Sequence, residues 1–153
     1  MDQNSLMLMD ATALNAFIQE VFPQVKDDFL VEEAAPYEIT LRLRVQDRHL
    51  RPGGTVSGPS MFGLADVTVY LLTLSLIGPK ALAVTTNSSL DFLRKPEAGR
   101  DLLAKGRLLK LGKTLSVGDV LIYSEGKAEP VARASMTYAI PPAGSAAARH
   151  SGA

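Results

Sequence analysis

A single carboxylate, Asp66, is the most chemically suggestive residue of this chain. It is the one charged residue between Met61 and Ile77, and neither lysine nor arginine occurs from position 52 to position 79. Burying an ionised carboxylate is costly unless it is paired or hydrogen-bonded, and strongly perturbed acids often mark catalytic sites. Asp66 is therefore a candidate general base or nucleophile. The alternative is an acid that reaches solvent along a polar stripe or accepts hydrogen bonds from nearby hydroxyl groups.

The neighbours of Asp66 predict a stripe on one helix face. In a helix, the spacings i±3, i+4 and i+7 place Gly63, Tyr70 and Thr73 on the side of Asp66. Such a stripe would line a pocket. We expect its depth to depend on the packing of four residues: Met61, Phe62, Tyr70 and Leu74.

A glycine-rich loop, Gly53-Gly-Thr-Val-Ser-Gly58, precedes this helix. Backbone N–H groups at a helix N-terminus can stabilise a developing oxyanion, although the simpler interpretation is a plain loop and cap. Eight helical residues span about 12 Å, whereas both groups must lie about 3 Å from one reacting carbonyl. If they cooperate, Asp66 of one subunit must meet the loop of another across a two-fold dimer.

Composition excludes several classes of protein. The 153 residues suit one domain, and 16 basic residues balance 16 acidic ones, which argues against a nucleic-acid partner. The chain lacks cysteine and has two histidines, His49 and His150. We therefore expect no disulfide, thiolate nucleophile, metal site or cofactor.

The sequence predicts neither a secretory signal nor a membrane span. The N-terminus lacks the pattern of a secretory signal, and a carboxylate inside a membrane-spanning helix is costly. The segment Met61 to Ile77 is better explained as a buried helix, so we expect a cytoplasmic protein without a membrane partner.

Periodicity predicts the elements that must position these residues. Asp10 caps a short helix at about 13–21, within 10–22, and Pro59 begins a long helix over 59–77 that Gly78-Pro79 ends. Alternation over Tyr37–Val45 predicts a half-buried strand. Further strands follow, spaced as in an antiparallel meander: 81–93, 102–111, 114–124 and 131–140. The prediction is one α+β domain over residues 1–141, a curved antiparallel sheet around one long helix, with a disordered tail at 142–153.

Three motifs in the correct order resemble the hotdog-fold thioesterases of the phenylacetic-acid-degradation (PaaI-like) group of acyl-CoA thioesterases. Gly54-Thr-Val-Ser-Gly-Pro-Ser-Met-Phe-Gly-Leu-Ala-Asp66 resembles the signature G-x-x-H-G-G-x-x-x-x-L-A-D. Leu90-Asp-Phe-Leu-Arg-Lys-Pro-Glu-Ala-Gly99 resembles a strand followed by a proline-glycine turn, and Leu109-Lys-Leu-Gly-Lys-Thr-Leu115 resembles a K-x-G-K/R segment. The resemblance covers over half of the chain.

The resemblance implies hydrolysis of an acyl-CoA thioester in a site at a dimer interface. It makes Asp66 the general base or nucleophile and the Gly58 amide the group that polarises the carbonyl. A hydroxyl that helps to place water would be Thr85 or, with a slip of one residue, Thr86. The residues themselves add two candidate substrate contacts: Ser57, whose hydroxyl could hydrogen-bond a substrate, and Tyr70, from the stripe beside Asp66. Four basic residues match phosphate-binding positions, although each could be an ordinary solvated charge: Arg94, Lys95, Lys110 and Lys113.

Departures from the family pattern leave other functions open. Ser57 replaces the usual histidine, Pro59 replaces the second glycine, and Arg51 stands where an asparagine is common. A non-catalytic acyl-CoA or acyl-ligand binding protein on the same fold is therefore the main alternative. A dehydratase or hydratase is less well supported, because such enzymes usually have a histidine in the site.

We expect an oligomer. The strand over 81–93 carries the polar run Thr85-Thr-Asn-Ser-Ser89, which could pair edge to edge with its symmetry mate. The expected assembly is a homodimer, with a homotetramer formed as a dimer of dimers left open.

Overall fold

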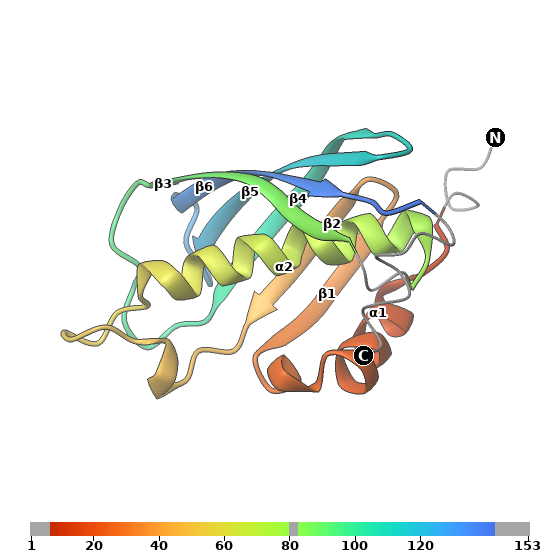
Figure 1. Ribbon diagram of the computed structural model, residues 1–153. Coiled ribbons are helices and arrows are strands. Elements are labelled where there is room, and N and C mark those ends of the chain that lie inside the picture. The colour runs from red at the N-terminus through yellow and green to blue at the C-terminus, as the bar shows by residue number, and fades with distance from the viewer. Residues whose placement is uncertain (1–6, 80–82, 143–153) are drawn as a thin grey trace.

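A six-stranded antiparallel sheet curls around one long helix (Figure 1). The structure, a computed structural model, describes residues 7–79 and 83–142. The sheet has the order β1-β2-β4-β5-β6-β3, and the architecture is the hotdog fold expected from the sequence. The elements are α1 (Ala11–Val21), β1 (Phe29–Ala35), β2 (Glu38–Leu43), α2 (Gly58–Ile77), β3 (Val84–Phe92), β4 (Leu102–Leu111), β5 (Leu115–Ser124) and β6 (Pro130–Ala139), with short 3-10 turns at Pro23–Val25 and Asp47–His49.

The helix α2 is the core of the domain. Ser57 caps its start by accepting from the Ser60 N–H at 3.3 Å, and Gly78 ends it with a φ of +91°. The buried hydroxyls of Thr68 and Thr73 donate to the carbonyls four residues earlier, so they cost little inside an apolar core. Although α2 is long and apolar enough to span a membrane, most of it is buried in the protein, which confirms the buried-helix interpretation.

Two strand glycines let the sheet approach α2 closely. A Cβ at Gly106 would lie 2.7 Å from the Thr68 Cγ2 atom, and a Cβ at Gly118 would lie 3.2 Å from the side chain of Val69. Larger residues at these positions would push the helix away from the sheet. The strand sequence therefore fixes where the helix crosses.

The two edges of the sheet differ. At the β1 edge, the side chain of Asn15 in α1 accepts from the Val31 N–H at 2.8 Å and donates to the Val31 carbonyl at 3.1 Å. Helix α1 therefore covers part of that edge. At the other edge, β3 pairs with β6 on one side, and no described strand pairs with its other side.

Most predicted elements are confirmed, with three differences. The strand β1 was not predicted, and Tyr37, expected to begin β2, lies in the β1–β2 turn with a φ of +66°. The meander holds for β4, β5 and β6, but β3 lies beyond β6 instead of beside β4. The predicted strand over 81–93 is found as Val84–Phe92, and its first two residues lie outside the described part. The predicted tail also lies there, apart from Pro142.

Candidate active site

Asp66 is held by two hydroxyl groups from neighbouring strands. Its Oδ1 atom accepts from the Thr85 hydroxyl at 2.5 Å and from the Tyr138 hydroxyl at 2.7 Å. The Tyr138 hydroxyl also lies 2.8 Å from the Asp66 carbonyl oxygen. Asp66 itself is half-buried. The carboxylate is thus hydrogen-bonded, as the alternative from the sequence anticipated, and it also lines a cavity.

That cavity has a volume of about 390 Å³ and lies between α1, α2 and the start of β3. Asp66, Thr85, Tyr138 and Tyr70 supply its polar groups. The other lining residues are apolar: Phe17, Val21, Phe22, Val67, Ala83 and Val84. An apolar cavity with a few convergent polar groups is the usual form of a small-molecule site.

The aromatic rings of the cavity support one another. The ring of Tyr70 stacks on that of Tyr138, with centroids 5.9 Å apart, and the ring of Phe22 meets Tyr70 edge-on at 6.3 Å. Burial, and then the charge of Asp66, raise the pKa of the Tyr138 phenol, and burial raises the pKa of Tyr70. Both phenols therefore stay protonated near neutral pH. Tyr138 remains a hydrogen-bond donor to the carboxylate.

Gly58 lies at the N-terminus of α2, two helical turns from Asp66, and is not among the residues that line the cavity. The ring of Phe92, at the end of β3, packs against it. The distance between Gly58 and Asp66 within one chain therefore remains about 12 Å, as the helix geometry predicts. Ser57, expected to contact substrate, instead caps the helix.

The loop before α2 is fixed by His49. The buried His49 carbonyl accepts from the Ser57 N–H at 2.8 Å, and the ring Nδ1 atom accepts from the Gln46 N–H at 2.9 Å. The ring Nε2 atom lies 3.5 Å from an oxygen of the buried Asp28. His49 therefore has a structural role at the entry to the helix, away from Asp66.

Only part of the predicted polar stripe reaches the cavity. Tyr70 lines it, but Thr73 is buried and bonded to the Val69 carbonyl and the Ser116 hydroxyl, and Gly63 is not part of the lining. The cause is that the sheet covers the face of α2 on which Thr73 lies. Of the three other residues expected to set the pocket depth, Met61 and Leu74 are buried elsewhere in the core and Phe62 is partly exposed.

The structure separates the two candidate hydroxyls. Thr85 faces Asp66, whereas Thr86 is exposed and its hydroxyl lies 3.4 Å from the Thr137 carbonyl. Consecutive strand residues face opposite sides of the sheet, and Thr86 also lies in a bulge between Thr85 and Asn87. Thr85 is therefore the residue that joins the site.

The four candidate phosphate-binding residues lie at two ends of the sheet. Arg94 and Lys95 lie two and three residues after the end of β3, and Arg94 contacts the Pro130 carbonyl and the carboxylate of Glu129. Lys110 is the penultimate residue of β4 and Lys113 lies in the β4–β5 turn, both exposed. Within one chain the four residues do not form one cluster.

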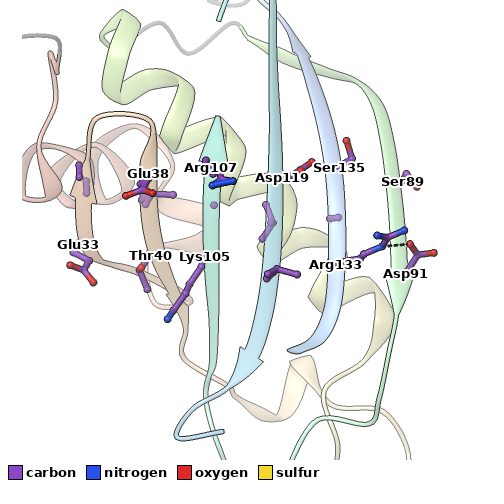
Figure 2. Close-up of a pocket in the computed structure, with 17 residues that line it drawn as sticks. Glu33, Glu38, Thr40, Ser89, Asp91, Lys105, Arg107, Asp119, Arg133 and Ser135 are labelled. Atoms are coloured by element: carbon purple, nitrogen blue, oxygen red, sulfur yellow. Dashed lines mark hydrogen bonds and ion pairs between the residues drawn. The ribbon is translucent and has the colours of Figure 1, made fainter. Parts of the chain in front are cut away.

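A larger hollow of about 740 Å³ lies on the outer face of the sheet. Figure 2 shows its charged side chains standing apart along the strands, with Arg133 and Asp91 paired at 2.8 Å. Acidic and basic groups alternate across it, and its lining lacks the doubly hydrogen-bonded, half-buried acid found at Asp66. The smaller cavity is therefore the better candidate site.

Sequence reasoning missed Tyr138 and the contribution of α1. Tyr138 lies in a strand in which apolar and polar residues alternate, and this pattern predicts only an ordinary core residue. Val21 and Phe22 are apolar residues that follow the buried residues of α1. They were the signal in the sequence that α1 also contributes to the cavity.

Comparisons with known proteins agree with this fold. The family model described as the thioesterase superfamily matches residues 53–131. A solved Silicibacter sp. TM1040 structure, named "putative thioesterase", is 61% identical, with a TM-score of 0.84 over 92% of this chain and 97% of that one. A mutant of the phenylacetic acid degradation protein PaaI from Thermus thermophilus is 28% identical, with a TM-score of 0.67 over 78% of this chain and 99% of that one.

A Streptococcus mutans UA159 protein, solved with acetyl CoA bound, is 27% identical, with a TM-score of 0.66 over 75% of this chain and 90% of that one. The family match covers more than half of the 153 residues. The resemblance seen in the sequence motifs is therefore confirmed. This chain belongs to the thioesterase superfamily and is a thioester hydrolase.

Proposed function

We propose that this protein hydrolyses acyl-CoA thioesters, with Asp66 as the general base or nucleophile. The observation that carries the proposal is a half-buried carboxylate, oriented by two hydroxyls, at the polar end of an apolar cavity. The cavity would hold the acyl group and place its thioester carbonyl near Asp66. The Streptococcus mutans relative with acetyl CoA bound supports the choice of a CoA ester.

As a general base, Asp66 removes a proton from water while the water oxygen attacks the thioester carbonyl carbon. The tetrahedral intermediate carries its negative charge on the former carbonyl oxygen, to which the Gly58 amide of a second subunit donates. When the C–S bond breaks, the thiolate of CoA takes the proton from Asp66, and a carboxylic acid and CoA are released. As a nucleophile, Asp66 would instead displace the thiolate to form an anhydride that water then hydrolyses.

Dimerisation through β3 would bring the two groups together. The edge of β3 is free in the described chain, whereas Asn15 covers the opposite edge at β1. Four large apolar side chains on or next to β3 and α2 are exposed: Phe62, Val84, Phe92 and Leu93. An exposed edge flanked by apolar side chains is suited to pairing with a second copy.

The contacts of β3 explain why such pairing would complete the site. Thr85 near one end touches Asp66, and Phe92 at the other end packs on Gly58. Antiparallel pairing of two β3 strands about an axis near Ser89 places Phe92 of one chain opposite the Thr85 bulge of its partner. Each Gly58 then approaches the Asp66 of the other chain, and two identical sites result.

The same arrangement would bring basic residues from both chains together at each end of the paired β3 strands. Arg94 and Lys95 follow Phe92, whereas the turn that carries Lys113 lies near the start of β3, because Leu115 and Val84 both pair with Ala139. Pairing therefore moves the first pair towards the Lys110 and Lys113 of the other chain. These residues are proposed to bind the phosphates of the nucleotide.

The test is hydrolysis of a panel of acyl-CoA esters by the purified protein and by Asp66→Asn. We expect release of CoA by the wild type and a loss of kcat of at least about 10²-fold in the variant, because the proton acceptor is removed. Asp119→Asn, an exposed acid on the outer sheet face, is the matched control and should keep full rate. Full rate in Asp66→Asn, or no turnover of any ester, would refute the proposal.

Non-catalytic acyl-CoA binding is the alternative function, favoured by one observation. Ser57 caps the helix where the family usually has a histidine, and Pro59 cannot donate an N–H. Calorimetry that detects binding of a CoA ester without turnover would favour this alternative.

A further inference from the structure

The two hydroxyls at Asp66 contact the same oxygen atom. Both the Thr85 hydroxyl, at 2.5 Å, and the Tyr138 hydroxyl, at 2.7 Å, donate to Oδ1. We propose that Tyr138 is a positioning residue which, together with Thr85, occupies Oδ1 and leaves Oδ2 as the oxygen that takes the proton from water. This inference rests on the proposed function of Asp66.

The asymmetry between the two oxygens is the basis of the proposal. A carboxylate oxygen accepts about two hydrogen bonds, so the two donors fill the capacity of Oδ1. Among residues 7–79 and 83–142, no group donates to Oδ2. Asp66 is half-buried and lines the cavity, so in this proposal Oδ2 is the oxygen that a water molecule there contacts.

Tyr138 is rigidly placed for this task. Its side chain is 3% exposed and stacks on Tyr70, and its hydroxyl also lies 2.8 Å from the Asp66 carbonyl oxygen. Thr85 and Tyr138 are direct partners in the β3–β6 register, so one cross-strand pair supplies both donors. Rotation of the Asp66 carboxylate would break two hydrogen bonds, and the two strands therefore hold Oδ1 in place.

The proposal predicts that the carboxylate loses its orientation when one hydroxyl is removed. In Tyr138→Phe, we expect kcat to fall roughly 10-fold with KM nearly unchanged. Phenylalanine keeps the ring and its stack, so a role in packing alone would leave kcat unchanged.

Three further variants make the test specific. Thr85→Val should lower kcat as Tyr138→Phe does, and Thr85→Ser should lose less because it keeps the donor. Tyr123→Phe is the matched control, since Tyr123 lies on β5 and packs under Lys105, outside the cavity. It should leave kcat unchanged.

The outcomes separate this proposal from the proposed function. Activity in Asp66→Asn would refute the proposed function and, with it, the positioning role. An inactive Asp66→Asn together with wild-type kcat in Tyr138→Phe would refute the positioning role alone. If Tyr138→Phe does not fold, as judged by its circular dichroism, Thr85→Val decides, because Thr85 is partly exposed at an edge strand.

Discussion

The ring of Phe92 covers the backbone of Gly58, so that a Cβ at Gly58 would lie 3.2 Å from the Phe92 Cζ atom. Phe92 ends the same strand that begins beside Asp66, where Thr85 donates to the carboxylate. One sheet edge therefore contacts both the acid and the start of the helix that carries the Gly58 amide. This relationship makes the β3 edge the structural link between fold and proposed chemistry.

Gly58→Ala should impair turnover more than folding. The added methyl group must displace the Phe92 ring by a few tenths of an ångström, and it narrows the approach to the Gly58 amide. Misplacement of a carbonyl-polarising donor is expected to lower kcat/KM roughly 10- to 100-fold. Steady-state kinetics on the best acyl-CoA ester measure this.

Gly63→Ala is the control for that substitution. A Cβ at Gly63 meets no atom within 4 Å, and the residue lies in the same helix. Alanine there should keep the activity and add about 0.5–1 kcal/mol to the free energy of unfolding. Equal values of kcat/KM in Gly58→Ala and Gly63→Ala would show that the Gly58 amide takes no part in the proposed site.

Ser89→Cys should form a covalent dimer under mild oxidation. The chain has no other cysteine, and an axis near Ser89 would place the two introduced thiols opposite each other across paired β3 strands. Antiparallel partners have Cα atoms about 4.5–5.5 Å apart, which suits a disulfide. Non-reducing gel electrophoresis measures the product.

Ser135→Cys provides the matched control for the cross-link. Ser135 is the β6 partner of Ser89 and is also exposed on the outer face. Its symmetry mate would be three strand spacings away, about 14 Å, which is too far for a disulfide. A cross-link in both variants, or in neither, would contradict pairing through β3.

The sequence predicts the candidate site incompletely, because some of its residues stand out in the local sequence and others do not. Asp66 is visible as one charge in an apolar helix, and Gly58 as a glycine before it. Tyr138 is far from both in the chain and carries the pattern of a buried strand residue. It becomes a partner of Asp66 because β6 and β3 are neighbours, and strand order is not encoded in local periodicity.

The fold shows the same division between local and non-local information. The strands β2 and β4 alternate regularly and were predicted, whereas β1 has a bulge between Val31 and Glu33 and then two glutamates and two alanines. Its alternation is therefore interrupted after three residues. The position of β3 beyond β6 depends on a connection that crosses the sheet, which spacing alone does not reveal.

Gly106→Ala should destabilise the protein because β4 contacts α2 closely at this residue. The new Cβ would lie 2.7 Å from the Thr68 Cγ2 atom. Overpacking of this kind costs about 1–3 kcal/mol of unfolding free energy, measurable by urea denaturation. Thr68→Ser removes that methyl group and should recover much of the loss in the double variant. Additive losses would show that the contact is not the cause.

Phe22→Ala should change which acyl groups are accepted. Phe22 lines the cavity and meets Tyr70 edge-on, so its removal widens the apolar end of the pocket. The ratio of kcat/KM for a long straight-chain acyl-CoA to that for acetyl-CoA should rise about 10-fold. Leu109→Ala, an exposed residue of β4 outside the cavity, should leave this ratio unchanged. An unchanged ratio of the two kcat/KM values in Phe22→Ala would show that the acyl group binds outside this cavity.

His49 should make folding stability depend on pH below 6.5. Burial of the ring, and then the charge of Arg48, lower the pKa of His49 from its usual value of 6.5, and the neutral ring accepts from the Gln46 N–H. Asp28, which contacts both the ring and Arg48, is the acidic group that faces it.

Below pH 6.5 the unfolded chain therefore binds a proton at His49 that the folded chain does not. The unfolding free energy should fall as the pH decreases from 6.5 towards the lowered pKa. His49→Asn offers an amide oxygen to the Gln46 N–H but does not titrate. Urea denaturation at pH 7.5, 6.5 and 5.5 should show a larger loss of stability in the wild type than in this variant. An equal loss of unfolding free energy in the wild type and in His49→Asn would assign the pH dependence to carboxylates that both proteins share. The loop before α2 would then not depend on a neutral His49.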